Sequence, residues 1–336
     1  MKEHLDRLLE AVEGAGTVLI LPHNDPDPDA IASAVALHRL LTERSGVEEV
    51  QVAYSGIIGR AENRALVRHL DRPLRRLARS DLRRSACIGL VDTQPGAGNV
   101  TVPDGSEIAI VLDHHPRREA GRATRFALVR PDIGATSTLL TMLLQAADID
   151  PPPLLATALF YGIKTDTMGL GRGTYSEDVA AYSYLQLRID AEVLSDIEYA
   201  QAPAAYFQQL DAALRASRVY DSLVVSYLGA MTHPDLAAEM ADLLLRLEGT
   251  RWALCMGVYE GELILSVRTR DRRGWAGRLA QGIVGDQGTA GGHGSMGGGQ
   301  IALEDRDLDQ LVREIRGCVL EHLNIAPEHR SGHPLI

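Results

Sequence analysis

Short apolar runs alternate with helix-like patterns in the first part of the chain. The runs that read as strands are mostly aliphatic and lie at residues 17–22, 50–54, 86–91 and 108–112. Segments with helical spacing fall between several of them, at residues 30–41, 61–70 and 134–147. Strands that are covered on both faces are apolar along their length. The alternation therefore predicts an α/β fold in which a mostly parallel sheet has helices on both faces.

A run of three prolines at residues 151–153 interrupts this alternation. Further helical segments follow at residues 154–164, 177–187 and 203–217. Residues 174–177 have the form of a capping box at the start of the second of these segments. We predict a first domain over residues 1–216 that includes a helical linker at about 170–216.

From Val219 onward the chain is richer in strand-like segments. Residues 219–228 read as a strand, and residues 252–259 and 262–269 read as a hairpin that turns at Glu260-Gly261. Helical patterns lie at residues 234–247, 275–284 and 308–323, and a glycine-rich loop follows the second of them. The tail after Ala326 has no periodicity and is expected to be mobile. These elements predict a smaller α/β domain over residues 217–336.

Length and composition are those of a globular protein. The chain has 336 residues, which suits two domains of ~100–200 residues each. No segment approaches the ~18–20 apolar residues of a membrane span, and the charged N-terminus does not resemble a signal peptide. Cys87, Cys255 and Cys318 lack a CxxC spacing, so three reduced thiols are expected. We therefore expect a cytoplasmic protein with no membrane partner.

The charge of the chain limits the partners that it can bind. The formal net charge is −11, whereas binding along a nucleic-acid duplex needs a basic surface. Duplex DNA is therefore not expected as a partner. A small phosphorylated substrate stays open, because bound metal ions can supply local positive charge. Lys2 and Lys164 are the only lysines, a pattern that genome composition explains.

Four short segments carry clusters of acidic and imidazole groups. They lie at residues 23–33, 91–93, 112–116 and 162–167, and the first three directly follow a predicted strand. Sites in open α/β sheets form beyond the carboxyl ends of the strands. Carboxylates that converge there repel one another unless a cation neutralises them. Mixed carboxylate and imidazole ligands suit Mn²⁺, Mg²⁺, Fe²⁺ or Zn²⁺, and six candidate ligands favour two metals, a recurrent arrangement for phosphoryl hydrolysis.

The third segment contains the triplet Asp113-His114-His115 and resembles the DHH phosphoesterase superfamily, which is named for it. The four segments match the four N-terminal motifs of that superfamily in order. The glycine-rich segment at residues 291–299 resembles the glycine–histidine motif of the DHH-associated C-terminal domain. The resemblance covers nearly the whole chain. It implies a metal-binding catalytic domain followed by a substrate-binding domain.

The resemblance also implies a ligand set for two divalent cations. The six ligands would be His23, Asp27, Asp29, Asp92, His114 and Asp166. Asp92 would bridge the two ions, with His23 and Asp27 on one side. The cations would be Mn²⁺, with Mg²⁺, Fe²⁺ and Co²⁺ as alternatives.

Roles in catalysis and substrate binding follow from the same resemblance. Asp92, His114 and His115 would be the catalytic residues, and a metal-activated hydroxide would attack phosphorus. His115 would face the substrate phosphate, and Asp113 would orient an imidazole from behind. The substrate-binding residues would be His115, Arg268, Gly291, Gly292, His293 and Gly298, holding the substrate between the domains.

Elementary chemistry agrees with this division. Glycines let backbone N–H groups approach an anion closely, and arginine suits bidentate phosphate binding. Five arginines precede the glycine-rich segment, at 268, 270, 272, 273 and 278, and we expect Arg268 to face the substrate and several others to be solvated. Pro28, Ala32 and Met296 depart from the residues usual in these motifs, as does the acidic Asp25. None of these departures removes a ligand.

Simpler interpretations exist for several of these residues. Asp27 and Asp29 could cap the helix that begins near Ala30, and we favour metal ligation with capping as a by-product for one of them. Asp25 is interpreted as a solvated turn residue. Lys164 fits a cation near phosphate and a surface lysine equally well. The hydroxyl side chains at residues 136–138 are interpreted as helix caps.

Three functions remain to be distinguished. The first is a phosphodiesterase or exonuclease-type hydrolase that cleaves short nucleotides, because the chain resembles oligoribonucleases and dinucleotide phosphodiesterases. Its substrates would be nanoRNA, linear or cyclic dinucleotides such as pApA or pGpG, or 3′-phosphoadenosine 5′-phosphate, and a homodimer is compatible with it. The second is a pyrophosphatase or exopolyphosphatase, whose relatives lack the glycine–histidine motif. The third is a non-catalytic nucleotide sensor, which would be expected to have lost ligands.

Overall fold

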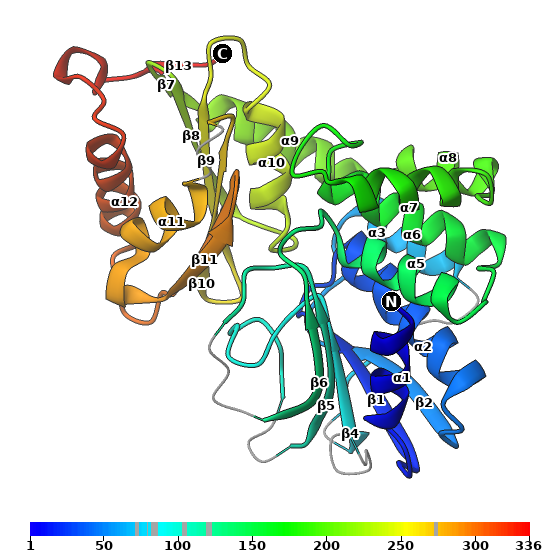
Figure 1. Cartoon of the computed structure of the whole chain (residues 1–336). Helices are drawn as coiled ribbons and strands as arrows, with labels where there is room; N and C mark the ends of the chain where they lie inside the picture. Colours follow the sequence, from blue (N-terminus) through cyan, green and yellow to red (C-terminus); the bar gives the residue numbers. More distant parts are fainter. Residues whose placement is uncertain (71–73, 79, 82–86, 103–105, 119–122, 272–274) are drawn as a thin grey trace. The chain divides into compact units, whose positions relative to one another are not determined.

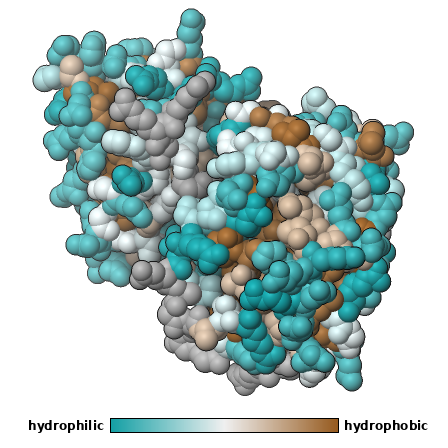
Figure 2. All heavy atoms as spheres, in the orientation of Figure 1, coloured by the Kyte–Doolittle hydropathy of each residue, from teal (hydrophilic) through white to brown (hydrophobic). Residues whose placement is uncertain are grey.

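The computed structural model describes the chain except for residues 71–73, 79, 82–86, 103–105, 119–122 and 272–274. It divides into two compact units, Met1–Ala200 and Gln201–Ile336 (Figure 1). Within the described residues no helix is both long enough and apolar enough to cross a membrane. The face drawn in Figure 2 is mostly hydrophilic, with hydrophobic areas scattered over it.

Six parallel strands form the sheet of the first unit, in the order β3-β2-β1-β4-β5-β6. Their bounds are β1 Thr17–Pro22, β2 Glu49–Tyr54, β3 Arg75–Arg76, β4 Cys87–Val91, β5 Ile108–Asp113 and β6 Thr124–Val129. The predicted α/β fold with a parallel sheet is confirmed. Strand β6 was not predicted, because it lies at the sheet edge and exposed residues such as Arg125 interrupt its apolar pattern.

Helices and apolar clusters cover the sheet of the first unit (Figure 1). The described helices are α1 Lys2–Glu10, α2 Pro28–Arg44, α3 Ala61–His69, α5 Thr136–Ala146, α6 Pro153–Asp166, α7 Ser176–Gln186 and α8 Ala191–Glu198. Alternate residues of β1 face opposite ways, as the period of a strand requires. Val18 and Ile20 join the cluster that includes Leu37 of α2. Leu19 and Leu21 join a second, smaller cluster.

The strand order reverses beside β1, which pairs with β2 on one side and with β4 on the other. The chain therefore leaves β1 and β4 toward different neighbours. Ligands of open α/β sheets bind at such a point. The topology thus places the loop between β1 and α2 beside the residues that follow β4.

A seven-stranded mixed sheet forms the second unit, in the order β11-β12-β10-β9-β8-β7-β13. Its strands are β7 Arg218–Tyr220, β8 Leu223–Ala230, β9 Trp252–Tyr259, β10 Glu262–Thr269, β11 Thr289–His293, β12 Met296–Ala302 and β13 His333–Pro334. Its helices are α9 Ala204–Ala216, α10 Leu236–Leu244, α11 Ala276–Val284 and α12 Leu308–His322, with short 3₁₀ turns at Gly285–Gln287 and Pro327–His329. The predicted hairpin at Glu260-Gly261 is present as β9 and β10.

The glycine-rich segment is a β-hairpin and not the predicted loop. β11 pairs antiparallel with β12, so that Gly292 faces Gly297 across the ladder. The first turn of α11 lies directly against this hairpin. A Cβ atom at Gly297 would lie 2.3 Å from the carbonyl oxygen of Ala276, and one at Gly277 would lie 2.3 Å from that of Gly292. Glycine is required here because two backbones come into direct contact.

Three further predictions differ from the structure. The first unit ends at Ala200 rather than near residue 216, because α9 belongs to the second unit, where the Ser226 hydroxyl of β8 donates a hydrogen bond to the Ala213 carbonyl of α9. The cap of α7 is shifted by one residue, since the Asp178 carboxylate accepts the N–H of Tyr175 at 2.9 Å. The C-terminal tail is not irregular throughout, because β13 pairs with β7.

Candidate metal centre

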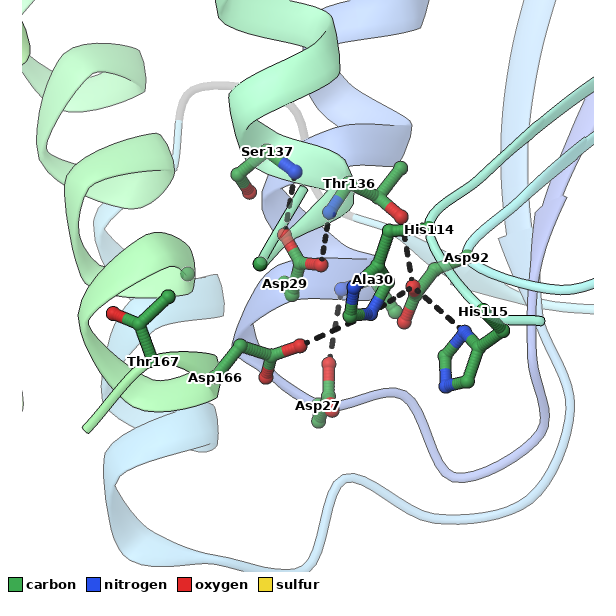
Figure 3. Close-up of polar contacts among 12 residues, drawn as sticks. Asp27, Asp29, Ala30, Asp92, His114, His115, Thr136, Ser137, Asp166 and Thr167 are labelled. Carbon is green, nitrogen blue, oxygen red and sulfur yellow. Dashed lines mark hydrogen bonds and ion pairs between the residues drawn. The ribbon is translucent and has the colours of Figure 1, made fainter. Parts of the chain in front are cut away.

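Acidic and imidazole side chains of the first unit gather beyond the carboxyl ends of its central strands (Figure 3). His23 directly follows β1, Asp92 directly follows β4, and His114 directly follows β5. Asp166 is the last residue of α6, and Asp29 lies in the first turn of α2. Three strand ends and two helix ends therefore bring together residues that lie far apart in the sequence.

Asp92 lies at the centre of this cluster. Its Oδ2 atom is 3.4 Å from His23 Nε2, and its Oδ1 atom is 3.5 Å from His114 Nε2 and 3.6 Å from His115 Nδ1. Asp92 is 1% exposed. Its backbone has a φ of 57°, in the left-handed region that Asp and Asn tolerate better than most residues. The two carboxylate oxygens of Asp92 thus face two different sets of side chains.

The predicted ligands form overlapping groups of three. The groups are His23, Asp27 and Asp92; Asp29, His114 and Asp166; and Asp92, His114 and His115. Within each group one ligand atom from every residue lies within 4.8 Å of the others. His114 Nε2, for example, is 3.3 Å from Asp166 Oδ2. The structure thus brings all six predicted metal ligands together, with His115 beside them.

Asp27 and Asp29 also cap helices, but different ones. Asp27 is the N-cap of α2, and its Oδ1 atom accepts the N–H of Ala30 at 3.0 Å. Asp29 is fully buried and accepts the N–H groups of Thr136 and Ser137, the first two residues of α5, at 2.7 Å each. Capping as a by-product for one of the two residues is thus confirmed at Asp27, whereas Asp29 caps a helix that the sequence did not indicate. Its carboxylate neutralises the positive end of another helix.

Close packing fixes the position of Asp29. Helix α6 passes so near that a Cβ atom at Gly162 would lie 2.5 Å from Ser137 Oγ and 3.0 Å from Asp29 Cα. A larger residue at position 162 would push α6 away from α5 and from the Asp29 backbone. The packing of three helices thus holds this carboxylate in place.

Thr136 connects the two sides of the cluster. Its backbone N–H donates to Asp29, and its hydroxyl donates to Asp92 Oδ1 at 2.8 Å. The sequence interpretation of this threonine as a simple cap missed the contact with Asp92. A neutral hydroxyl at the start of a helix gives no signal that distinguishes the two roles.

His115 stands at the more open side of the cluster. Its side chain is 33% exposed, whereas that of His114 is 5% exposed. The Oδ1 atom of Asp113 lies 2.8 Å from His115 Nδ1 and also accepts the backbone N–H of His115 at 3.2 Å. Asp113 is itself buried and belongs to none of the groups of three. It therefore orients the His115 ring by hydrogen bonding and is not itself a candidate metal ligand, as the resemblance implied.

The electrostatics of the cluster favour the binding of positive charge. Burial raises the pKa of Asp29 well above its usual value, and the charges of Asp92 and Asp166 raise it further. Burial also raises the pKa of Asp166. Burial alone would lower the pKa of His23 and His114, but hydrogen bonds and charges from the neighbouring carboxylates raise both well above 6.5. In the absence of another cation, these pKa shifts favour the protonated forms of these four residues.

A divalent metal fits this donor set. Carboxylate oxygens and imidazole nitrogens are the ligands of Mn²⁺, Fe²⁺ and Zn²⁺, and mutually repelling buried carboxylates need a cation for charge balance. The described residues contain these donors in overlapping groups that share Asp92 and His114. The arrangement could hold two cations next to each other.

The predicted substrate residues of the second unit lie on its glycine hairpin and on β10. Gly291 and Gly292 belong to β11, and Gly298 belongs to β12. Arg268 of β10 is 9% exposed, and its Nε atom donates to Asp242 of α10 at 2.7 Å. The guanidinium also donates to Ser266 Oγ at 2.8 Å and to the Gly297 carbonyl at 3.5 Å. Arg268 thus ties α10 to the hairpin.

Part of the predicted binding set lies outside the described residues. This applies to the side chain of His293, whose backbone ends β11. Arg272 and Arg273 of the arginine cluster, which were not part of that set, also lie outside the described residues.

Other charged residues near the metal centre have structural contacts. Lys164 pairs with Glu198 of α8. Arg172 donates to the backbone carbonyl of Asp166 at 3.2 Å. Asp25 is half-buried, with a φ of 53°, and accepts the N–H of Ile57 at 2.6 Å. It lies in a turn, as interpreted, but it is only partly solvated because its carboxylate braces the loop after β1.

Residues 17–163 match the protein-family model described as the DHH family, N-terminal domain. An uncharacterized protein of Methanocaldococcus jannaschii is 35% identical over 328 residues, which cover 95% of this chain and 66% of that protein. The cyclic-di-AMP phosphodiesterase PdeA of Listeria monocytogenes is 24% identical over 279 residues, which cover 76% of this chain and 41% of PdeA. The chain thus spans less than two thirds of both relatives.

A solved structure has a similar fold over the whole chain. The crystal structure of an exopolyphosphatase-related protein from Bacteroides fragilis superposes with a TM-score of 0.74 at 18% sequence identity. The match covers 96% of this chain and 97% of that one. The likeness concerns the architecture of both units.

Proposed function

Because the chain belongs to the DHH family, we propose that it is a metal-dependent phosphoesterase with two divalent cations, one on each side of Asp92. The observation that carries this proposal is the position of the two Asp92 oxygens. Oδ2 faces His23 and Oδ1 faces His114, at 3.4 and 3.5 Å. A carboxylate whose oxygens point to two separate ligand groups suits a bridging role between two ions.

The site residues would then comprise ligands of the two cations and one residue that contacts the substrate. His23 and Asp27 would hold one cation, and Asp29, His114 and Asp166 would hold the other. Bound divalent cations would polarise the phosphoryl oxygens and activate a water for attack on phosphorus. His115, more exposed than His114 and held by Asp113, would face the substrate phosphate and would donate a hydrogen bond to it from Nε2 when the ring is protonated. Mn²⁺ is the proposed ion, because it accepts this mixture of oxygen and nitrogen ligands.

Short nucleotides are the proposed substrates. PdeA, the Listeria relative, is named for cyclic-di-AMP hydrolysis, which favours a linear or cyclic dinucleotide here. The net charge of −11 also favours a short substrate over a long strand, because long strands bind through extended basic surfaces. In the second unit, the exposed Gly292 and the half-buried Gly291 and Gly298 of the hairpin would offer backbone N–H groups to the remainder of the substrate.

Two other functions make different predictions. A pyrophosphatase or exopolyphosphatase would use the same metals but would not need the glycine hairpin. A non-catalytic nucleotide sensor would bind nucleotide without turnover. The sensor is disfavoured by the full set of carboxylate and imidazole ligands.

The test is a turnover assay with Mn²⁺ present and then removed by a chelator. The panel contains pApA, pGpG, cyclic di-AMP, cyclic di-GMP, 3′-phosphoadenosine 5′-phosphate, a short RNA and pyrophosphate. We expect mononucleotide release from a dinucleotide or from the short RNA, and loss of that release with the chelator. Turnover of pyrophosphate alone would assign the chain to the second function. Binding of dinucleotide without turnover of any substrate would assign it to the third.

A second test concerns the hairpin. His293→Ala is expected to raise KM or weaken nucleotide binding while leaving Mn²⁺ affinity unchanged, because position 293 lies in the second unit and the metal ligands lie in the first. His329→Ala, at another position of the second unit, serves as a control that is expected to change neither quantity. Unchanged nucleotide binding in His293→Ala would remove this residue from the proposed substrate site.

A further inference from the structure

We propose that Gln94 is a positioning residue for His115 and that it acts through Asp113. The inference rests on the proposed function, in which His115 meets the substrate phosphate. Gln94 lies two residues after Asp92 and is 5% exposed. It is neutral and is not among the ligand groups. Its contacts nevertheless lead directly to the catalytic imidazole.

The Gln94 amide has a partner on each side. Its Nε2 atom donates to Asp113 Oδ2 at 2.7 Å and to the backbone carbonyl of Pro116 at 3.1 Å. Its Oε1 atom accepts the backbone N–H of Arg118 at 3.0 Å. Both ends of one buried amide are therefore satisfied.

The chemistry of these partners fixes the orientation of the amide. A carboxylate and a peptide carbonyl only accept hydrogen bonds, and a peptide N–H only donates. A flipped amide would place its oxygen against two acceptors and its NH₂ group against a donor. Gln94 can therefore adopt a single orientation, in which it always donates to Asp113.

In this orientation the two oxygens of the Asp113 carboxylate have different partners. Oδ2 is occupied by Gln94, which leaves Oδ1 for His115. The Oδ1 atom accepts the backbone N–H of His115 and lies 2.8 Å from its Nδ1. A neutral His115 ring must then carry its proton on Nδ1, because the carboxylate can only accept. The Nε2 atom would then face the substrate side, where it carries a proton only when the ring is protonated.

Gln94 also holds the loop at residues 115–118, so a loss of activity alone would not establish the proposal. The test therefore reads the His115 ring directly. Long-range ¹H–¹⁵N spectra of protein loaded with diamagnetic Mg²⁺, at alkaline pH where the ring is neutral, report which nitrogen carries the proton. We expect the Nδ1-protonated form in the parent protein. This readout does not depend on turnover, so it distinguishes failure of this proposal from failure of the proposed function.

The decisive variant is Gln94→Met, which keeps the length of the side chain and removes its hydrogen bonds. We expect a mixture of His115 tautomers and a loss of kcat on the order of 10–100-fold, the range for partners that orient a functional side chain. KM and Mn²⁺ affinity should change little. Asp113→Asn should give a similar tautomer mixture, and the double variant should lose no more than the larger single loss, because both changes interrupt one chain of contacts.

Two controls complete the design. Gln186→Met, at an exposed position of α7, should leave the spectrum and kcat unchanged. Gln94→Glu keeps the shape of the side chain but places a carboxylate against Asp113 and should shift the His115 signals at least as far as Gln94→Met. An unchanged Nδ1-protonated ring in Gln94→Met would overturn the proposal and leave Gln94 with a loop-stabilising role. So would an Nε2-protonated ring in the parent protein.

Discussion

The two candidate functional regions of this chain are built in opposite ways. The metal centre of the first unit consists of charged side chains, each held by a backbone N–H group, a hydroxyl or another side chain. The glycine hairpin of the second unit works through the absence of side chains, because backbones meet at Gly277, Gly292 and Gly297. The first region should be sensitive to changes of charge at constant shape. The second should be sensitive to added volume at constant charge.

The largest expected effect is at Asp92. Asp92→Asn keeps the shape and suits the φ of 57°, since Asn tolerates the left-handed region, whereas Ala would add backbone strain. Removal of the shared charge should lower kcat by more than the roughly 100-fold typical of outer-shell partners, with little change in melting temperature. The exposed Asp132→Asn is the matched control and should behave like the parent. Near-normal activity of Asp92→Asn would refute a bridging role.

Added side-chain volume at the hairpin should have the next largest effect, which is a loss of stability. The Cβ of Gly297→Ala would lie 2.3 Å from the Ala276 carbonyl, so the hairpin and α11 must separate, at a cost of ~1–3 kcal/mol in the free energy of unfolding. The nearest atom to a Cβ at Gly298 is 3.6 Å away, so Gly298→Ala should leave the fold intact. Denaturant unfolding would measure both.

The same pair of variants tests where substrate binds. If the hairpin contacts the substrate, Gly298→Ala should weaken nucleotide binding without a change in stability. Equal stability of the two variants would show that α11 does not need Gly297. Unchanged nucleotide binding in Gly298→Ala would place the substrate elsewhere on the second unit.

A smaller effect is expected from pH. The pKa values of His23 and His114 are raised well above 6.5 in the metal-free protein, and those of Asp29 and Asp166 are raised as well. A metal must displace these protons, so Mn²⁺ affinity should fall as the pH decreases through the raised histidine values. Calorimetry in buffers of different ionisation enthalpy should detect net proton release. Affinity that does not depend on pH would exclude these histidines as ligands.

The smallest effect is expected at Lys164. This residue pairs with Glu198, and both side chains are partly exposed, at 37% and 22%. Such pairs contribute about 0–1 kcal/mol to stability. Lys164→Met should therefore leave kcat, KM and Mn²⁺ affinity nearly unchanged. A large rise in KM would indicate that the Lys164 ammonium group contacts the substrate.

The comparison also explains what the sequence could predict. His23, Asp92 and His114 stood out because Asp and His side chains that directly follow buried strands have few structural reasons to be there, and the family resemblance implied the remaining ligands. Thr136 and Gln94 were missed because they are neutral, and their importance depends on Asp92 and Asp113, which folding brings to them from 44 and 19 residues away. The glycine hairpin was predicted as a loop because glycine has low β-propensity, and only backbone pairing defines its strands.

The capping of α5 by Asp29 has a consequence for hydrogen exchange. The first amides of a helix have no partner within the helix and usually exchange rapidly with solvent. The amides of Thr136 and Ser137 instead donate to a fully buried carboxylate at the metal centre. Their exchange rates are thus expected to report, residue by residue, how often this centre opens, even when no substrate is present.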